Sequence, residues 1–268
     1  MRLPVWRYGG GWHGHDDAVA IEEPLELRLH TPDGPLPLGV LMRTPGDDHD
    51  LLLGWLVSEG LMPQALTLAA DPENANVWHL STPEHARLAA GARLSVSSSA
   101  CGVCGSGSVE RLLARAIPPE PFPVPIDPAV LADLPRRLMT VQPTFAATGG
   151  VHGAALVTLA GDLLVAREDV GRHNAVDKVV GWAHRRGVLP LSGQVLVVSS
   201  RAGFEIVQKA VTAGIGAVVS VGAATSLAVD TAAAFGVVLC GFARDGRFTV
   251  YTGAGSLATL AIVGDHPL

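Results

Sequence analysis

Beyond Gly153 the chain alternates between short apolar runs and helix-like segments, and this alternation constrains the fold more than any other feature. The apolar runs have the length of strands and are Val195–Ser199, Ala217–Val221 and Val237–Phe242. Segments with helical periodicity lie between or before them, over His173–Arg186, Phe204–Ala213 and Thr225–Ala234. Strands that alternate with helices at this spacing predict an α/β fold, in which a mixed sheet carries helices on both faces.

Two predicted hairpins, each of two antiparallel strands, extend this pattern. Ala154–Leu159 and Leu163–Ala166 flank Gly161-Asp162, which is a hairpin signal. The last apolar run turns at Asp245-Gly246 into a strand over Arg247–Tyr251. We therefore assign residues 144–268 to one α/β domain.

The amino-terminal part mixes short elements and predicts a smaller α+β unit over residues 1–117. Alternating leucines at 25, 27 and 29 and the run Leu38–Arg43 predict two strands, and Asp48–Glu59 predicts a helix that ends at Gly60. The pattern predicts a strand over Ala92–Val96 and a helix over Val109–Ala116. The glycine-rich amino terminus, which holds His13 and His15, is expected to fray. Residues 118–143 join the two units. They comprise a proline-rich linker and a helix over Asp127–Val141 that Pro135 kinks or splits.

Composition narrows the class of protein. A net charge of −6 argues against a non-specific nucleic-acid binder. Met1–Asp17 has no apolar run typical of a secretory signal. The uncharged stretch Ala210–Val229 is long enough for a membrane span, but its glycines favour a buried strand between helices. Three cysteines make no disulfide framework, so we expect a cytoplasmic protein.

Two of the three cysteines, Cys101 and Cys104, lie in the glycine- and serine-rich stretch Ser97–Ser108, which predicts a mobile, exposed loop. Three chemistries suit such a pair. It supplies half of a zinc site, although the chain has no second CxxC or HxxxH pair. It also suits a thioredoxin-like dithiol or a carrier of sulfane sulfur, in which one thiolate holds a persulfide. The loop alone does not decide between them.

Four arginines follow the predicted strand ends and are expected at one edge of the sheet. They are Arg172, Arg201, Arg244 and Arg247. Guanidinium groups near helix amino termini favour phosphate, so an anionic, nucleotide-like ligand is predicted. The alternative is that these arginines form surface ion pairs with Glu168, Asp169, Glu205 and Asp245.

Other polar residues carry weaker signals. His152 follows a tight glycine turn. It fits a site residue and a structural histidine with satisfied hydrogen bonds equally well. Cys240 lies mid-strand and reads as a buried apolar side chain. The cluster Asp47–Asp50 fits the first turn of a helix better than a metal site, and we predict no metal ligands.

Taken together, several longer motifs resemble the FdhD family of sulfur carriers for formate dehydrogenase. The motifs are Cys101–Gly105, Thr148–His152, Glu168–Lys178, Ser199–Lys209 and Gly241–Phe248, with Glu23–Leu25, Thr44–Asp47 and Ser58–Gly60 nearer the amino terminus. The likeness runs from about residue 22 to about residue 251. The chain departs from it at Val151, where threonine is usual, and at Gly153, where alanine is usual.

The resemblance implies a sulfurtransferase. It would accept sulfur from a cysteine desulfurase as a persulfide on Cys101, with Cys104 as partner, and pass it to the molybdenum or tungsten bis(pterin guanine dinucleotide) cofactor of formate dehydrogenase. It also implies a cytidine-deaminase-like fold, a homodimer, and cofactor binding by the segment Phe242–Arg247. The expected cofactor-binding residues are Phe242, Ala243, Arg244, Asp245, Gly246 and Arg247, with Arg172, His173, Ser200 and Arg201.

Two rival functions remain open. A zinc-dependent nucleotide hydrolase of the deaminase type needs His-x-Glu and a proline before the CxxC pair, whereas Ala100 precedes Cys101 and the chain has no His-x-Glu. A non-catalytic chaperone for the cofactor would need the arginines but not the cysteines. Substitution of the cysteines separates this function from sulfur transfer.

Overall fold

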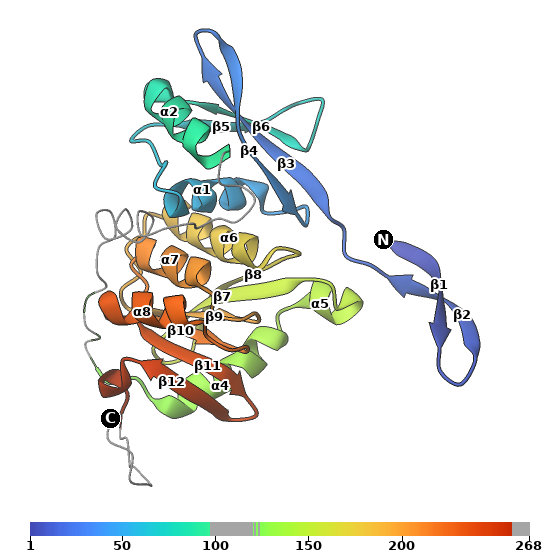
Figure 1. Cartoon of the computed structure of the whole chain (residues 1–268), viewed down its shortest axis with the longest axis vertical. Coiled ribbons are helices and arrows are strands. Elements are labelled where there is room, and N and C mark those ends of the chain that lie inside the picture. Colours follow the sequence, from blue (N-terminus) through green and yellow to red (C-terminus); the bar gives the residue numbers. More distant parts are fainter. Residues whose placement is uncertain (97–119, 121, 123, 259–268) are drawn as a thin grey trace.

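The computed structural model describes residues 1–96, 120, 122 and 124–258, and for 91–96 it describes the backbone alone. A large sheet with helices on both faces lies beneath a smaller sheet, and a two-stranded hairpin projects to one side (Figure 1). The strand order of the large sheet is β12-β11-β10-β9-β7-β8. Its strands are β7 (His152–Thr158), β8 (Leu163–Asp169), β9 (Gln194–Val198), β10 (Ala217–Ser220), β11 (Val238–Arg244) and β12 (Arg247–Thr252).

The large sheet is mixed, as predicted. β9, β10 and β11 run parallel, while β7 is antiparallel to both β8 and β9, and β12 is antiparallel to β11. Parallel neighbours need helical crossovers, and α7 (Phe204–Thr212) and α8 (Ser226–Ala234) supply them. The predicted α/β organisation of this region is thus confirmed, whereas the predicted likeness to cytidine deaminases stays a prediction.

Apolar side chains on the two faces of this sheet form separate cores. On one face they pack against α7, α8 and α6 (Arg172–Arg185), through residues such as Val179 and Ile206. On the other face they pack against α4 (Pro128–Met139) through Leu131, Leu134 and Leu138. α4 runs unbroken through Pro135, so the helix is not split there. Helices cover both faces because alternate strand side chains point to opposite sides.

The smaller sheet has the strand order β4-β3-β6-β5. Its elements are β3 (Glu23–Thr31), β4 (Gly34–Arg43), β5 (Thr67–Ala70) and β6 (Val77–Ser81), with α1 (Asp48–Ser58) and α2 (His85–Val96). Alternate leucines of β3 point into a core that α1 and α2 complete, and Leu51, Leu56 and Leu88 are fully buried there. β3, β4 and α1 follow the sequence prediction, whereas β5 and β6 were not anticipated.

Two sequence predictions in this part were wrong. Ala92–Val96 is the last part of helix α2 and not a strand, because the alanine- and leucine-containing segment before it propagates a helix into these residues. The amino terminus is not frayed either. It forms a hairpin of β1 (Arg2–Tyr8) and β2 (Trp12–Ala18), whose strands pair along their full length. Backbone hydrogen bonds between β1 and β2 order these residues, although their glycine-rich composition favours a disordered terminus.

The CxxC stretch and the helix over Val109–Ala116 lie outside the described residues, as does most of the proline-rich linker. The division into residues 1–117, 118–143 and 144–268 also stays a prediction. Across the described ranges, none of the helices is long and apolar enough to span a bilayer.

Candidate functional site

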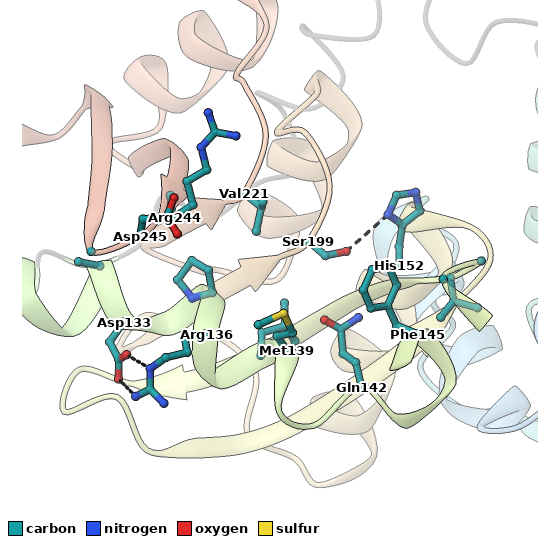
Figure 2. A pocket seen from close by; sticks show the side chains of 18 of the residues that line it. Asp133, Arg136, Met139, Gln142, Phe145, His152, Ser199, Val221, Arg244 and Asp245 are labelled. Atoms are coloured by element: carbon teal, nitrogen blue, oxygen red, sulfur yellow. Dashed lines mark hydrogen bonds and ion pairs between the residues drawn. The ribbon is translucent and has the colours of Figure 1, made fainter. Parts of the chain in front are cut away.

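A pocket of about 1000 Å³ opens beside the carboxyl ends of the parallel strands of the large sheet (Figure 2). This is where sheets of this class commonly bind ligands. Helix α4, the short helix α5 (Pro143–Thr148) and the turn between β11 and β12 form its walls. Its lining includes the side chains of Asp133, Arg136, Met139, Gln142, Phe145, His152, Ser199, Val221, Arg244 and Asp245.

The turn between β11 and β12 brings a guanidinium group and a carboxylate to one wall of the pocket. Asp245 (φ 52°) and Gly246 (φ 73°) both have left-handed backbones, as a tight two-residue turn requires. The turn places Arg244 opposite Arg247 on the neighbouring strand. A shift in register between Gly241 and Arg244 precedes the turn.

Phe242 occupies that irregular segment with φ 52°, a conformation that costs a non-glycine residue of this size about 1–2 kcal/mol. Its backbone N–H donates to the carbonyl oxygen of Gly222 at 2.9 Å, which holds the strained segment in place. As a result the Phe242 ring is about half exposed while Ala243 is fully buried and lines the pocket. Backbone strain of this kind occurs often at ligand-binding sites.

Opposite this turn, helix α4 adds a second charged pair. The Asp133 carboxylate accepts hydrogen bonds from Arg136 at 2.6 and 2.8 Å and from Arg137 at 2.8 Å. Hydrogen bonds from Arg136 and then Arg137 lower the pKa of Asp133 to about 2, so this carboxylate is ionised under ordinary conditions. Arg137 also donates to the carbonyl oxygen of Gly161 at 2.7 Å, while the Arg136 side chain stays largely exposed at the mouth of the pocket.

The other end of the pocket is polar but uncharged. The Ser199 Oγ accepts a hydrogen bond from the Gly153 N–H at 2.9 Å and lies 3.5 Å from the Nδ1 of His152. Burial, followed by the nearby Arg172 and His173, lowers the pKa of His152, so its imidazole is neutral near pH 7. Gln142 lies on the same side, and its side chain is buried.

Glu168 positions the wall that carries Phe145. Its two carboxylate oxygens accept hydrogen bonds from the backbone N–H groups of Thr144 at 2.9 Å and Phe145 at 2.7 Å. These two groups are unpaired donors in the first turn of α5, so Glu168 caps that helix. The motif residue Glu168 therefore acts on the pocket through α5, although it does not line it.

Of the ten predicted cofactor-binding residues, Ala243, Arg244, Asp245 and Gly246 line the pocket. Phe242 and Arg247 lie beside them on the same two strands. Among the four arginines predicted at this edge of the sheet, Arg244 is the one that belongs to the described lining of the pocket. Cys101 and Cys104 lie outside the described residues.

The other four predicted residues lie elsewhere on the same edge of the sheet. At the start of α6, the His173 Nε2 is 2.8 Å and Arg172 is 3.8 Å from the Glu205 carboxylate, as the ion-pair alternative predicted. The Oγ of Ser200 donates to the carbonyl oxygen of Arg201 at 3.0 Å. Arg201 itself is exposed.

Several remaining motif residues form buried ion pairs rather than part of the pocket. Lys178 lies 2.8 Å from Asp169, and Lys209 lies 2.8 Å from Asp177, with all four side chains almost fully buried. Ser58 of α1 donates to Asp177 at 2.7 Å, so this network ties the amino-terminal part to α6 and α7. These residues serve the interior of the fold, because each buried charge is tolerated only while its partner is present.

Sequence reasoning missed the contribution of α4 and α5 to the pocket. Asp133, Arg136, Met139, Gln142 and Phe145 follow a proline-rich segment with no recognisable binding motif. Only the approach of α4 to the edge of the sheet reveals them. Cys240 is fully buried, as predicted, and burial raises its pKa to about 12.

Comparison with known proteins places the sequence in a family. The model of the FdhD/NarQ family matches residues 20–258. The chain belongs to the FdhD/NarQ family. Among curated FdhD/NarQ relatives, the sulfur carrier protein FdhD of Corynebacterium efficiens is 46% identical, over 88% of this chain and 90% of that protein. The sulfur carrier protein FdhD of Streptomyces coelicolor is 44% identical over 92% of both chains.

A solved structure supports the fold of this FdhD/NarQ chain. The crystal structure of a putative formate dehydrogenase accessory protein from Desulfotalea psychrophila superposes with a TM-score of 0.74. It covers 96% of this chain and 99% of its own, at 22% sequence identity. At that identity the likeness concerns the fold alone.

Proposed function

We propose that this protein is a sulfur carrier which delivers sulfur to the molybdenum or tungsten bis(pterin guanine dinucleotide) cofactor of formate dehydrogenase. The observation that supports this function best is the pocket, which combines the Arg244-Asp245-Gly246 turn with apolar walls and a volume of about 1000 Å³. A volume of this size suits the nucleotide portion of such a cofactor. Arg244 and Arg136 supply guanidinium groups for its phosphates. The curated relatives are named sulfur carrier proteins, which agrees with the proposed function.

In the proposed reaction the Cys101 thiolate attacks the outer sulfur of a persulfide on a cysteine desulfurase. A new S–S bond forms on Cys101, the S–S bond of the donor breaks, and its electron pair stays on the donor cysteine as a thiolate. The Cys104 thiolate then attacks the inner sulfur of the Cys101 persulfide. A Cys101–Cys104 disulfide forms, and the outer sulfur leaves with the electron pair as hydrosulfide for the bound cofactor.

The second step leaves Cys101 and Cys104 as a disulfide, so a thiol reductant must restore them before the next cycle. The persulfide sulfur is reduced to sulfide while the two cysteines are oxidised to the disulfide. A cellular dithiol or glutathione then returns the pair to thiols, which the reducing cytoplasm provides. Cys240 plays no part, because a buried thiol whose pKa is raised to about 12 is protonated at neutral pH.

Intact mass spectrometry tests the proposal. After incubation with a cysteine desulfurase and cysteine, the protein should gain about one sulfur mass that dithiothreitol removes. Cys101→Ala should abolish the gain, whereas Cys104→Ala should keep the gain but release no hydrosulfide. Cys240→Ala is the matched control and should behave as the wild type. A gain that persists in Cys101→Ala contradicts the assignment of the carrier thiol.

The same experiment separates sulfur transfer from the rival chaperone function. A cofactor chaperone would bind a guanine nucleotide in the pocket and gain no sulfur in any variant. We favour sulfur transfer because the curated relatives are named as sulfur carriers. Absence of sulfur uptake by the wild type, together with nucleotide binding, would establish the chaperone instead. The expected homodimer and cytoplasmic location belong to the same proposal.

A further inference from the structure

Two histidines that are far apart in the sequence meet on the smaller sheet. His30 of β3 and His79 of β6 come together because these neighbouring strands pair in parallel, with Arg28 opposite His79. The Nε2 of His30 lies 3.0 Å from the Nδ1 of His79. The two rings are tilted by 51°, with their centroids 5.0 Å apart, so ring nitrogens and not ring faces meet.

This pair lies on the face of the smaller sheet that points away from α1 and α2. Side chains alternate along β3, and Leu25, Leu27 and Leu29 point into the core that the two helices complete. His30 points to the opposite face, where it is exposed, while His79 is partly exposed. A ligand from solvent can therefore reach both rings.

Asp71 fixes the position of the proton on His79. The Asp71 Oδ2 lies 2.9 Å from the His79 Nε2, and the Asp71 Oδ1 accepts hydrogen bonds from the backbone N–H groups of Glu73 and Asn74. The hydrogen bond from His79, followed by that from Glu73, lowers the pKa of Asp71, so this carboxylate is ionised. An ionised carboxylate only accepts hydrogen bonds, so the Nε2 of His79 carries the hydrogen and its Nδ1 directs a free lone pair toward His30.

The distance between the two ring nitrogens suits a shared metal ion. Zn–N bonds of about 2.0–2.1 Å place two imidazole nitrogens of a tetrahedral site about 3.3 Å apart. The contact of 3.0 Å is close to that distance, so small rotations of the rings admit an ion. The proton on the Nε2 of His30 then moves to its Nδ1, and the ring stays neutral. Glu26 pairs with the neighbouring Arg28 at 2.8 Å, which limits the repulsion of a cation.

We propose that His30 and His79 bind one Zn²⁺ ion, with water molecules completing its coordination and Asp71 as a positioning residue. Imidazole nitrogens favour Zn²⁺, Cu²⁺ and Ni²⁺, whereas Mg²⁺ and Ca²⁺ favour oxygen ligands. A carboxylate that receives the second N–H of a ligating histidine is common at metal sites, and Asp71 has this place. Across the described ranges, no three His, Cys, Asp or Glu side chains form a metal cluster, so this site has two protein ligands.

The site is separate from the proposed function. His30, His79 and Asp71 lie outside the described lining of the pocket. The sequence predicts no metal ligands here, since the two histidines are 49 residues apart and share no motif. A bound ion would join β3 to β6 and stabilise the smaller sheet, because the two ligands come together only in the folded chain.

Isothermal titration calorimetry with ZnCl₂ tests the site on the full-length protein. The reference is the Cys101→Ala/Cys104→Ala variant, because cysteine thiolates also bind Zn²⁺. Added to this reference, His30→Ala and His79→Ala should each weaken Zn²⁺ binding at least about tenfold, and Asp71→Asn should weaken it about tenfold. Titration of the reference with MgCl₂ should show no binding at this site.

His85→Ala is the matched control. His85 begins helix α2, which packs on the leucine face of the smaller sheet, so its loss should leave Zn²⁺ binding unchanged. Thermal unfolding is the second measurement. ZnCl₂ should raise the Tm of the reference but not that of the His30→Ala or His79→Ala variant, whose transitions without zinc show that they fold.

Three outcomes would overturn the site: unchanged Zn²⁺ binding in both the His30→Ala and His79→Ala variants, an equal loss in His85→Ala, or no Zn²⁺ binding by the reference. Binding by Asp71→Asn that equals the reference would overturn the positioning role of Asp71. Each outcome leaves the proposed sulfur transfer untouched, because the reference lacks both cysteines of that reaction.

Discussion

Gly54 of α1 and Gly181 of α6 lie opposite each other where the two helices cross, so close that neither position has room for a side chain. A methyl group at Gly181 would overlap the carbonyl oxygen of Asp50, and one at Gly54 would overlap the carbonyl oxygen of Asp177. This contact joins the amino-terminal part to the α/β sheet through their backbones. Asp177, which supplies one of these two carbonyl oxygens, also forms the buried ion pair with Lys209.

Gly181→Ala should destabilise the protein strongly, because the added methyl group must push two packed helices apart. We expect the free energy of unfolding in urea to fall by about 3 kcal/mol or more. Gly193→Ala is the matched control, since Gly193 has open space around its Cα, and it should change the free energy by less than about 0.5 kcal/mol. Equal stability of the two variants would show that the helices separate easily.

Lys209→Met should leave the Asp177 carboxylate buried with no cation beside it. Removing one partner of such a pair costs about 3–5 kcal/mol, so we expect a large loss of stability in chemical denaturation. Arg87→Met removes one partner of the surface pair Arg87–Glu84 and should cost less than about 1 kcal/mol. A small effect for Lys209→Met would mean that water reaches Asp177.

The stability of the protein should depend on the ionisation of Asp50. Burial by itself raises the pKa of this carboxyl group, but hydrogen bonds from Arg185 and Arg167 outweigh it and hold the pKa below its ordinary range. A pKa that is lower in the folded state stabilises the protein above the unfolded value of about 4, and this contribution is lost as the pH falls below it. Urea unfolding between pH 6 and pH 3 measures the loss.

Asp50→Asn should reduce this loss of stability on acidification, since the neutral amide no longer titrates. Arg185→Gln should act in the same direction, because it removes a hydrogen bond at 2.8 Å that lowers the pKa of Asp50. An unchanged pH dependence in both variants would place the acid sensitivity in other carboxyl groups.

Phe242→Gly should make the protein more stable while it weakens nucleotide binding. Glycine adopts φ 52° without steric cost, and we expect a gain of about 0.5–1 kcal/mol. Phe242→Ala is the matched control, because it removes the ring but keeps a Cβ in the strained conformation, and it should bring no gain. Thermal unfolding and GDP titration of both variants provide the measurement. A stabilised Phe242→Ala would show that the ring and not the backbone carries the strain.

The alternation of strands and helices after Gly153 can be predicted from the sequence, because hydrophobic periodicity is a local property that each segment carries independently. The tight turn at Asp245-Gly246 is predictable in the same way, since few residues tolerate left-handed backbones. Contiguous motifs in the sequence also pointed to the FdhD family, and the match over residues 20–258 confirmed that membership.

Which of these motif residues reach the pocket and which pair in the interior depends on the packing of the folded chain. Asp169, Asp177, Lys178 and Lys209 stand in the same motifs as predicted site residues, yet they pair within the interior. The pocket, in contrast, takes α4 and α5 from a segment without any motif. Contacts between residues distant in sequence depend on how the layers pack, and neither periodicity nor spacing along the chain encodes that packing directly.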